Sequence, residues 1–358
     1  MRILFLGKRH PQQRDLVERP YGRFFHVPVG LAARGHEVRT LLCSHRRLPA
    51  LEVERAGVAW SSLDVRTLGV RRYLRQVTSE ASAFRPDWIV GVSDAWYGWL
   101  ARKLSQRVGA RLAVDAYDNY EAYMPWNLPL HWQWRRAIRD ADCVTAAGPQ
   151  LASLLNRQRR GRTPAAVVPM AADPAFVPRD RGEARATLGL PDSAALIGYS
   201  GSWARNRGTD VLLRAFRLLR ERSPAAQLVL TGRPPAHALA EPGVITLGYL
   251  PDAQLPLALS ALDVACVITA NTAFGRYSYP AKLCEAMACG IPVVATATAP
   301  VRWMLHDDAR SLVPIDDAHA LADRLLAQLH AEQVTYPNLP SWAESAERFE
   351  TALASVSP

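Results

Sequence analysis

The amino-terminal half of the chain alternates short apolar runs with stretches of helical period. The run Ile3–Leu6 is followed by Phe24–Ala33, where apolar positions recur with helical spacing, and then by the run Glu37–Cys43. This order predicts a strand, a helix and a second strand. Strand-like runs recur later in this half, separated by helical stretches near Arg72–Ala83, Ala95–Arg107, Leu130–Asp140 and Gln150–Arg157; the strands are Trp88–Val92, Arg111–Val114 and Cys143–Ala146. Strands that alternate with helices predict a parallel sheet.

The same alternation starts again after a linker. Asp173–Pro178 is rich in proline and lacks a period, which predicts an irregular connection. The expected strands after it are Ala195–Tyr199, Gln227–Leu230, Val244–Leu247, Val264–Ile268 and Pro292–Ala295, and the expected helices are Asp210–Glu221, Gln254–Leu259, Ala281–Ala288, Ala318–His330 and Trp342–Ala354.

The predicted fold class is therefore α/β, with two Rossmann-like doubly wound domains. We expect an amino-terminal domain over 1–170, a carboxyl-terminal domain over 171–340, and a last helix in 341–358 that packs back on the first domain. Ligands bind at the carboxyl ends of the strands in such sheets, so two facing domains would place the substrate site in the cleft between them.

Composition and charge narrow the ligand class. A chain of 358 residues with 49% hydrophobic and 21% charged residues is typical of a globular protein of about two domains. Lys and Arg number 43 against 33 Asp and Glu, a formal net charge of +10. This excess favours an anionic partner: phosphates, acidic glycans, nucleic acid or an anionic membrane surface.

The cysteines and the apolar runs predict the compartment. Five cysteines are an odd number and form no CxxC pair, so neither a disulfide framework nor a zinc site is indicated. The run Ile3–Leu6 is too short for a signal peptide or a membrane span, and no other run reaches spanning length. We expect a cytoplasmic protein whose contact with a membrane, if there is one, is peripheral and at the inner face.

Gly201–Gly208 is the first candidate phosphate-binding loop. It follows an expected strand and opens an expected helix, and the amide groups and dipole of a helix amino terminus favour an anion. Arg205 and Arg207 could add bidentate phosphate contacts. The alternative is an ordinary strand-to-helix loop with solvated arginines.

The segment Tyr277–Thr296 carries the sharpest pattern. Pro280 suits a first helical turn and Gly290 suits a helix end. Lys282 and Glu285 fall three apart on one face of that helix, so a cation for phosphate lies beside a carboxylate able to accept from both ribose hydroxyls. A nucleotide diphosphate would fit; the alternative is a surface ion pair of about 0.2–0.5 kcal/mol.

This segment resembles the signature of retaining GT-B glycosyltransferases of the family 4 type, the glycosyl transferases group 1. The resemblance extends over nearly the whole chain and is more specific in the carboxyl half; it includes Gly35-His36-Glu37-Val38, Val168-Pro169, Asp173–Pro178, Arg207–Leu213 and Leu247-Gly248-Tyr249. It implies a hexosyltransferase that takes its sugar from a UDP-type or GDP-type nucleotide sugar. We expect the enzyme to be metal-independent and to need no cofactor, because no acidic cluster has a credible metal-binding context and positive side chains can neutralise the leaving group.

The resemblance also implies roles for individual residues. Glu285 would hold the donor ribose, and Gly248 and Tyr249 would lie beside the base. Arg207 stands at the usual lysine position and would bind the diphosphate together with Lys282 and the loop at Gly201. Both cations would also act catalytically by stabilising the leaving diphosphate in a front-face displacement, with the donor phosphate assisting proton removal.

Two departures from the family pattern fall in the donor half. The commonest pattern has a second glutamate eight residues before Glu285, where it contacts the transferred sugar, and here Tyr277 stands in its place. The arginine that usually follows the loop glycine is replaced by Ser202, with Arg205 as a substitute. These departures bear on the identity of the sugar and on activity itself.

In the amino half, Tyr117-Asp118 stands where the family often has a His-Asp pair. Asp118 could orient or deprotonate an acceptor hydroxyl. The alternative is a capping role in the loop, for which aspartate is favoured. Asp94, after the strand Trp88–Val92, is a second candidate with the same alternative.

The acceptor is expected to be a glycan, a lipid-linked molecule or a small molecule. The loop from Lys8 to Arg23, with Arg9, His10, Arg14 and Arg19, would overhang the acceptor side of the cleft and favour an anionic acceptor; mobile surface charge is the alternative. Leu130–Arg136 and Met124–Trp126 could touch a membrane interface, although a packed amphipathic helix is favoured.

Two charged motifs are interpreted as structural. Asp140-Ala141-Asp142 spells the metal-binding Asp-x-Asp of glycosyltransferases of another fold, but it joins a helix to a strand. Arg157–Arg162 matches a nucleic-acid or heparin patch by charge, yet no nucleic-acid-binding motif accompanies it, so we expect a solvated helix end and no nucleic-acid partner.

Two rival functions remain. A catalytically silent member of the same fold, which binds a nucleotide sugar or serves as a scaffold, is suggested by Tyr277 and Tyr117. A nicotinamide-dependent dehydrogenase is disfavoured, because Gly7-Lys8-Arg9-His10 after the first strand is not GxGxxG.

Overall fold

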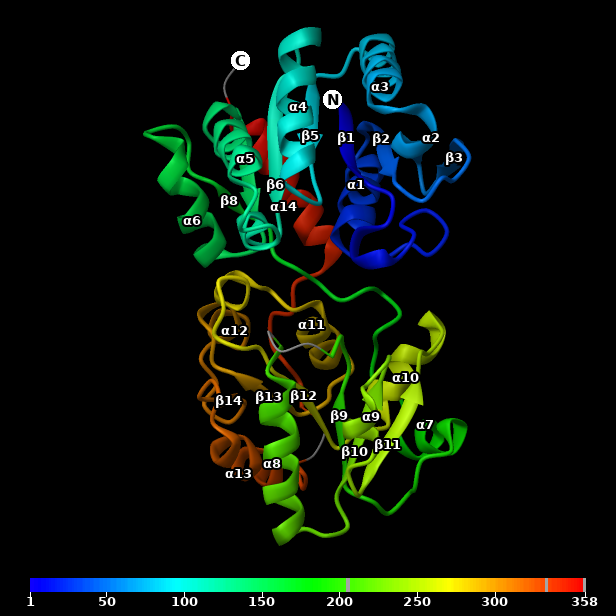
Figure 1. The fold of residues 1–358 in the computed structure, drawn as a ribbon, viewed down its shortest axis with the longest axis vertical. Coiled ribbons are helices and arrows are strands. Elements are labelled where there is room, and N and C mark those ends of the chain that lie inside the picture. Colours follow the sequence, from blue (N-terminus) through cyan, green and yellow to red (C-terminus); the bar gives the residue numbers. More distant parts are fainter. Residues whose placement is uncertain (204–206, 332–333, 357–358) are drawn as a thin grey trace. The chain divides into compact units, whose positions relative to one another are not determined.

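The structure is a computed structural model that describes residues 1–203, 207–331 and 334–356. It divides into two compact units, Met1–Met170 with Pro340–Pro358, and Ala171–Leu339 (Figure 1). The last helix, α14 (Trp342–Ala354), thus belongs to the first unit although the chain has passed through the second.

The first unit is built on an eight-stranded sheet of order β3-β4-β2-β1-β5-β6-β7-β8. Neighbouring strands are parallel except for the hairpin β3/β4 at one edge. The strands are β1 (Arg2–Lys8), β2 (Glu37–Ser44), β3 (Leu51–Arg55), β4 (Val58–Asp64), β5 (Trp88–Gly91), β6 (Arg111–Ala116), β7 (Cys143–Ala146) and β8 (Ala166–Val167). The expected parallel sheet is confirmed, and the antiparallel hairpin is an addition to it.

Helices cover this sheet, and α1 packs against α14. A Cβ placed on Gly30 of α1 would lie 2.4 Å from the Cβ of Ala346 in α14, so the close approach of the two helices requires glycine. The helices of this unit before α14 are α1 (Arg23–Ala33), α2 (Val65–Leu68), α3 (Val70–Phe84), α4 (Ala95–Val108), α5 (Leu128–Asp140) and α6 (Pro149–Arg159).

A buried ion pair joins distant segments of the first unit. Arg23, at the start of α1, donates to both carboxylate oxygens of Asp115 in β6, at 2.7 and 2.6 Å. Its remaining nitrogen donates to the backbone oxygen of Val168 at 2.6 Å. Both side chains are almost inaccessible to water, so each charge depends on its partner.

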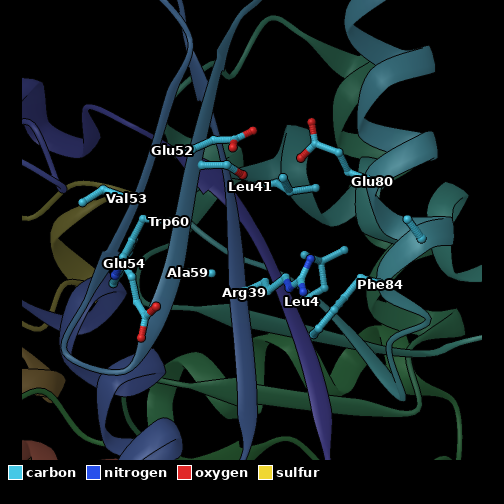
Figure 2. A pocket seen from close by; sticks show the side chains of 12 residues that line it. Leu4, Arg39, Leu41, Glu52, Val53, Glu54, Ala59, Trp60, Glu80 and Phe84 are labelled. Atoms are coloured by element: carbon cyan, nitrogen blue, oxygen red, sulfur yellow. The ribbon is translucent and has the colours of Figure 1, made fainter.

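A hollow of about 490 Å³ lies between α3 and the strands β2, β3 and β4. Figure 2 shows the carboxylates of Glu52 and Glu80 on opposite sides of it and Arg39 with Phe84 at its lower part. Burial, and secondarily the nearby charge of Glu52, raise the pKa of Glu80. Neither this hollow nor the hairpin that borders it was predicted from the sequence.

The second unit has a six-stranded parallel sheet of order β11-β10-β9-β12-β13-β14. Counted within the unit, this is the strand order 3-2-1-4-5-6 of a doubly wound dinucleotide-binding fold. The strands are β9 (Leu196–Tyr199), β10 (Gln227–Thr231), β11 (Val244–Gly248), β12 (Val264–Val267), β13 (Val293–Thr296) and β14 (Leu312–Val313); the helices are α7 (Arg181–Leu188), α8 (Thr209–Arg222), α9 (Ala236–Leu239), α10 (Leu255–Ser260), α11 (Ala281–Ala288), α12 (Ala299–Met304) and α13 (Ala318–Gln328).

Alternate side chains of β9 enter two different cores. Ile197 and Tyr199 pack with α8 and α13, whereas Leu196 packs with α7 and α11. This is the period of two that a strand covered on both faces requires. Asp263, just before β12, accepts from Arg185 at 2.8 Å and from the Leu196 amide at 2.7 Å, which ties α7 to the central strands.

Replacing Asp115 by Asn should destabilise the first unit by about 3–5 kcal/mol, because the charge of Arg23 would remain buried without its partner. Chemical denaturation followed by circular dichroism, with each unit allowed its own transition, measures the loss. Glu37→Gln is the matched control, since its ion pair with Arg2 is exposed and should contribute only about 0–1 kcal/mol. Equal effects of the two variants would contradict the role given to the buried pair.

Candidate functional site

The strand order of the second unit places a crevice beside β9. From β9 the chain moves to β10 on one side, whereas β12 pairs with β9 on the other side and leads to β13. In open parallel sheets this reversal opens a crevice at the carboxyl ends of the two strands, where ligands bind. Residues that follow these strands are therefore the first candidates for a binding site.

Lys282 and Gly201 meet at the carboxyl end of β9. The Lys282 Nζ lies 4.4 Å from the centre of the Tyr199 ring, a cation–π distance. Gly201 has φ +148°, and a Cβ placed there would lie 3.4 Å from the same Nζ. The glycine therefore gives the loop its conformation and leaves its backbone open beside an ammonium group.

A second cation acts on Lys282. Burial first, and then the charge of Arg207, lower the pKa of Lys282 to about 8, although Cys266 and Glu285 act in the opposite direction. The Arg207 guanidinium lies 4.7 Å above the Phe274 ring. An anion bound between the two cations would relieve their repulsion and restore the ammonium form of Lys282.

Helix amino termini add to the positive potential. Helix α8 begins at Thr209, directly after Arg207 and Gly208, and Gly208 has φ +74°. Lys282 lies in the first turn of α11, which begins at Ala281. Unpaired amide groups and the helix dipole favour an anion at such ends.

Glu285 lies one turn further along α11 and lines a small cavity of about 40 Å³. The same cavity is lined by Tyr199 and Ser200 at the end of β9 and by Thr231 at the end of β10. The Thr231 hydroxyl donates to that of Ser200 at 3.0 Å. A carboxylate and two hydroxyl groups therefore gather beside the cationic loop, a donor and acceptor set that suits a polyhydroxyl group.

The structure places the other predicted donor-half residues around these strands. Gly248 ends β11 with φ +62°, and its carbonyl accepts from the Gly232 amide at 2.6 Å. Tyr249, which follows it, is 67% exposed. Tyr277 is half-buried in a 3-10 turn, Gly275–Tyr277, that follows Phe274. Arg205 lies outside the described residues.

Asp118 of the first unit sits in a cluster of tyrosines after β6. Its carboxylate accepts from the Tyr123 hydroxyl at 2.6 Å, and the hydroxyls of Tyr123 and Tyr117 lie 3.2 Å apart. Burial and the charge of Asp118 raise the pKa of both tyrosines, so they remain neutral hydrogen-bonding groups. Tyr123 was not predicted as a partner of Asp118, because the sequence does not show which side chains the short turn Tyr120–Ala122 directs at the carboxylate.

The second acceptor candidate, Asp94, caps a helix. Its carboxylate accepts from the Trp96 amide at 2.9 Å at the start of α4. It also forms an ion pair with Lys8, at the end of β1. The capping interpretation of Asp94 is therefore supported, and Lys8 is engaged within the unit.

The Lys8–Arg23 loop was expected to face an anionic acceptor, with mobile surface charge as the alternative, and neither interpretation fits its two most buried arginines. Arg9 is 4% exposed and pairs with Asp15 at 2.9 Å and Glu18 at 3.3 Å. Arg23 is held by Asp115, as described above. Carboxylates supplied by the fold neutralise these two guanidinium groups, so an acceptor does not meet them.

The remaining charged motifs have structural partners. Asp140 pairs with Arg102 at 2.6 Å, and Asp142 accepts from the Leu112 amide at 2.9 Å. No group of three metal-ligating side chains is found within the described ranges 1–203, 207–331 and 334–356.

The segment Arg157–Arg162 was expected to be a solvated helix end. This prediction is wrong for Arg159, which is buried and donates to the carbonyls of Ile138 and Ala141.

Two further findings concern thiols and membranes. All five cysteines are buried and carry free thiols. Across the part of the chain that the structure describes, no helix has the length and apolar character needed to cross a bilayer.

Comparison with solved structures defines the class of fold. The chain matches sucrose-phosphate synthase from Thermosynechococcus elongatus with a TM-score of 0.73 at 18% identity, covering 99% of this chain and 94% of that one. It matches Anabaena HepE in complex with UDP with a TM-score of 0.69 at 15% identity, covering 99% and 100%. The fold is GT-B.

Family models identify the family within this class. The model for glycosyl transferase 4-like domains matches residues 25–171, and the model for glycosyl transferases group 1 matches residues 194–331. The chain belongs to the group 1 glycosyltransferases. The family resemblance and the fold class expected from the sequence are thus confirmed.

Curated relatives are similar over part of their length. D-inositol 3-phosphate glycosyltransferase of Stackebrandtia nassauensis is 29% identical over 243 residues, covering 59% of this chain and 54% of the relative. Phosphatidyl-myo-inositol mannosyltransferase of Mycolicibacterium smegmatis is 30% identical over 176 residues, covering 47% and 45%. The chain spans about half the length of these relatives.

The lysine geometry gives a direct spectroscopic test. The chain has only three lysines, Lys8, Lys103 and Lys282, so labelled lysine signals can be assigned by substitution. One signal should titrate near pH 8, because burial and Arg207 disfavour the ammonium form of Lys282, and NMR of the side-chain carbons measures it. That signal should be absent in Lys282→Met and present in the control Lys103→Met. Its persistence in Lys282→Met would refute the assignment.

Proposed function

We propose that this protein is a retaining glycosyltransferase that moves a sugar from a UDP-type or GDP-type nucleotide diphosphate to a hydroxyl acceptor. The observation that carries this proposal is the pairing of Lys282 and Glu285 on α11 at the carboxyl end of β9. The cation faces the Gly201 loop, and the carboxylate lines the cavity with Ser200 and Thr231. This is the charge pattern of a diphosphate joined to a ribose.

In this proposal the diphosphate lies between Lys282, Arg207 and the amino termini of α8 and α11. Glu285 accepts hydrogen bonds from the two ribose hydroxyls, which a carboxylate with two oxygens can do at once. Gly248 and Tyr249 lie beside the base, for which the exposed Tyr249 ring offers a stacking face. Arg205, which belongs to the same Gly201–Gly208 segment of the sequence, would add a third cation for the diphosphate.

Related proteins support the choice of donor and acceptor. HepE has been crystallised with UDP and with UDP-glucose, and it shares the fold of this chain. The names of the curated relatives place phosphorylated inositol or phosphatidyl-inositol on their acceptor side. An anionic, hydroxyl-rich acceptor, either a small molecule or lipid-linked, is accordingly proposed for this chain. A cytoplasmic location is proposed on a separate ground, the five free thiols.

The proposed reaction needs charge stabilisation more than a protein nucleophile. The bond from the anomeric carbon to the phosphate oxygen breaks while the acceptor oxygen bonds to the same face of that carbon. The acceptor proton passes to the departing diphosphate, whose negative charge Lys282, Arg207 and the helix termini stabilise without a metal ion. Asp118, held by Tyr123, is proposed to orient the acceptor hydroxyl.

Variants of the two key charges test the function. Arg207→Ala and Glu285→Ala should each weaken UDP or GDP binding about tenfold or more, since a lost hydrogen bond to a charged group costs about 1.5–3 kcal/mol. Isothermal titration calorimetry measures the affinities. Affinity in the wild type should also fall as pH rises through about 8, where Lys282 loses its proton.

The control for these variants is Arg222→Ala, an exposed arginine of α8 that pairs with Asp323. Transfer from a panel of UDP and GDP sugars, followed with EDTA present, then separates an enzyme from a silent binder. Unchanged diphosphate affinity in both site variants would disprove the donor site. Turnover that EDTA abolishes and manganese restores would disprove metal independence.

Tyr277 should determine which sugar is accepted. A phenol offers one donor-acceptor oxygen and a ring face where the common family pattern has a bidentate carboxylate, so a deoxy or otherwise modified sugar should be preferred. Comparison of kcat/KM over the donor panel for Tyr277→Phe and Tyr277→Glu checks this, and the order of donors should change in at least one variant. An unchanged order in both would place Tyr277 outside the sugar pocket.

A further inference from the structure

The outward face of α5 is unusual because its first turns are apolar and exposed. Leu128 is 68% exposed and Trp132 is 55% exposed, and Trp126, two residues before the helix, is 75% exposed. Leu130, Trp134 and other residues of the opposite face are buried. The exposed residues therefore form a stripe separate from the packed face. One face of α5 is packed, as the favoured interpretation of the sequence expected, and the other face is open for the surface contact that was its alternative.

The same stripe becomes basic further along the helix. Arg136 and Arg139 lie four and seven residues after Trp132, on the same side of α5. The Arg136 guanidinium lies 4.5 Å over the Trp132 ring. An aromatic group at the start of the stripe is thus followed by cations toward its end.

Helix α4, which packs beside α5, repeats this arrangement. The two helices contact each other through Gly98 of α4, at which a Cβ would lie 2.6 Å from the Trp134 ring of α5. The outer stripe of α4 begins with Trp96, 48% exposed, and Trp99, whose rings are 6.1 Å apart. It continues with Lys103 and Arg107, both exposed.

The two stripes share one direction and one spacing. Both helices follow the carboxyl ends of strands, β5 and β6, that run parallel to each other, so their aromatic starts lie at the same edge of the sheet. Trp96 to Lys103 and Trp132 to Arg139 are each seven residues, or about 10 Å along a helix. That distance exceeds the headgroup layer of a bilayer, roughly 5–7 Å on each side of the hydrocarbon core, so the cations can reach its outer, charged surface when the aromatic residues lie at its inner boundary.

We propose that the exposed surface formed by Trp96, Trp126, Leu128 and Trp132, with Lys103, Arg107, Arg136 and Arg139 behind it, docks on an anionic phospholipid bilayer. Tryptophan favours the boundary between headgroups and acyl chains, and Lys and Arg are attracted to anionic headgroups. The net charge of +10 adds to this attraction. Asp118 follows the neighbouring strand β6 at the same edge of the sheet, so docking would bring it toward the lipid surface.

Vesicle flotation of the full chain tests the proposal, without any measurement of sugar transfer. The wild type should bind vesicles of phosphatidylcholine with phosphatidylglycerol more tightly than vesicles of phosphatidylcholine alone, and added salt should weaken the difference. The double variant Trp126→Ser/Trp132→Ser should lose about tenfold or more of this binding. Lys103→Gln/Arg136→Gln should bind more weakly than the wild type and depend less on phosphatidylglycerol and on salt, because Arg107 and Arg139 remain.

The matched control is Val70→Ser/Leu239→Ser, which removes two exposed apolar side chains elsewhere, 63% and 44% exposed in the wild type. It should bind vesicles as the wild type does. The proposal is wrong if the wild type ignores phosphatidylglycerol vesicles, or if the tryptophan variant binds them as tightly as the control. It is also wrong if the tryptophan variant changes only the oligomeric state by light scattering, which would identify the surface as a protein interface.

Discussion

The ion pair between Arg23 and Asp115 is the interaction on which the first unit depends. One guanidinium group bonds the start of α1 to β6 and to the backbone at Val168, and the Ser345 hydroxyl of α14 reaches the adjacent Pro169 carbonyl at 3.0 Å. Segments that are up to 176 residues apart in the chain therefore meet around this buried charge. Since neither charge can be left alone in an apolar interior, the pair fixes where the chain leaves this unit.

The second unit uses a similar device for a different purpose. Asp263 accepts hydrogen bonds from Arg185 and from the Leu196 amide at the amino ends of β9 and β12, and these bonds hold the two strands in register. At the other end of β9, burial and then the nearby charge of Arg207 lower the pKa of Lys282. Positive charges therefore repel each other at this end of the sheet, and an anionic ligand would relieve that repulsion.

The basic character of the chain is distributed over three physically different settings. Arg9, Arg23 and Arg159 are buried and bonded to carboxylates or backbone carbonyls. Lys282 is half-buried at the proposed donor site, and the arginines of α5 are partly open to water behind exposed tryptophans. Net charge alone does not distinguish these settings, because burial and the nearest partner decide what each cation can do.

Much of the architecture follows from the sequence. Apolar runs separated by helical periods predict a strand-helix alternation, and the alternation predicts parallel sheets whose carboxyl ends carry the site. The boundaries of α11, α14 and β7 match their predicted ranges. Lys282 and Glu285 could also be singled out, since their spacing on one helix is a local property.

The tertiary structure alone decided the rest. The hairpin β3/β4 was not predicted, although Leu51–Glu54 alternates apolar and polar residues. Its position is decided by the fold, which leaves Glu52–Arg55 exposed at the edge of the sheet. The partners of Arg23, and the ring of Tyr199 under Lys282, come from segments far apart in the chain that only folding brings together. The hydrophobic period of a helix or strand depends on residues that are neighbours in the sequence. Whether a charged side chain is buried and paired depends on residues that can be nearly a hundred positions away, as Asp115 is from Arg23.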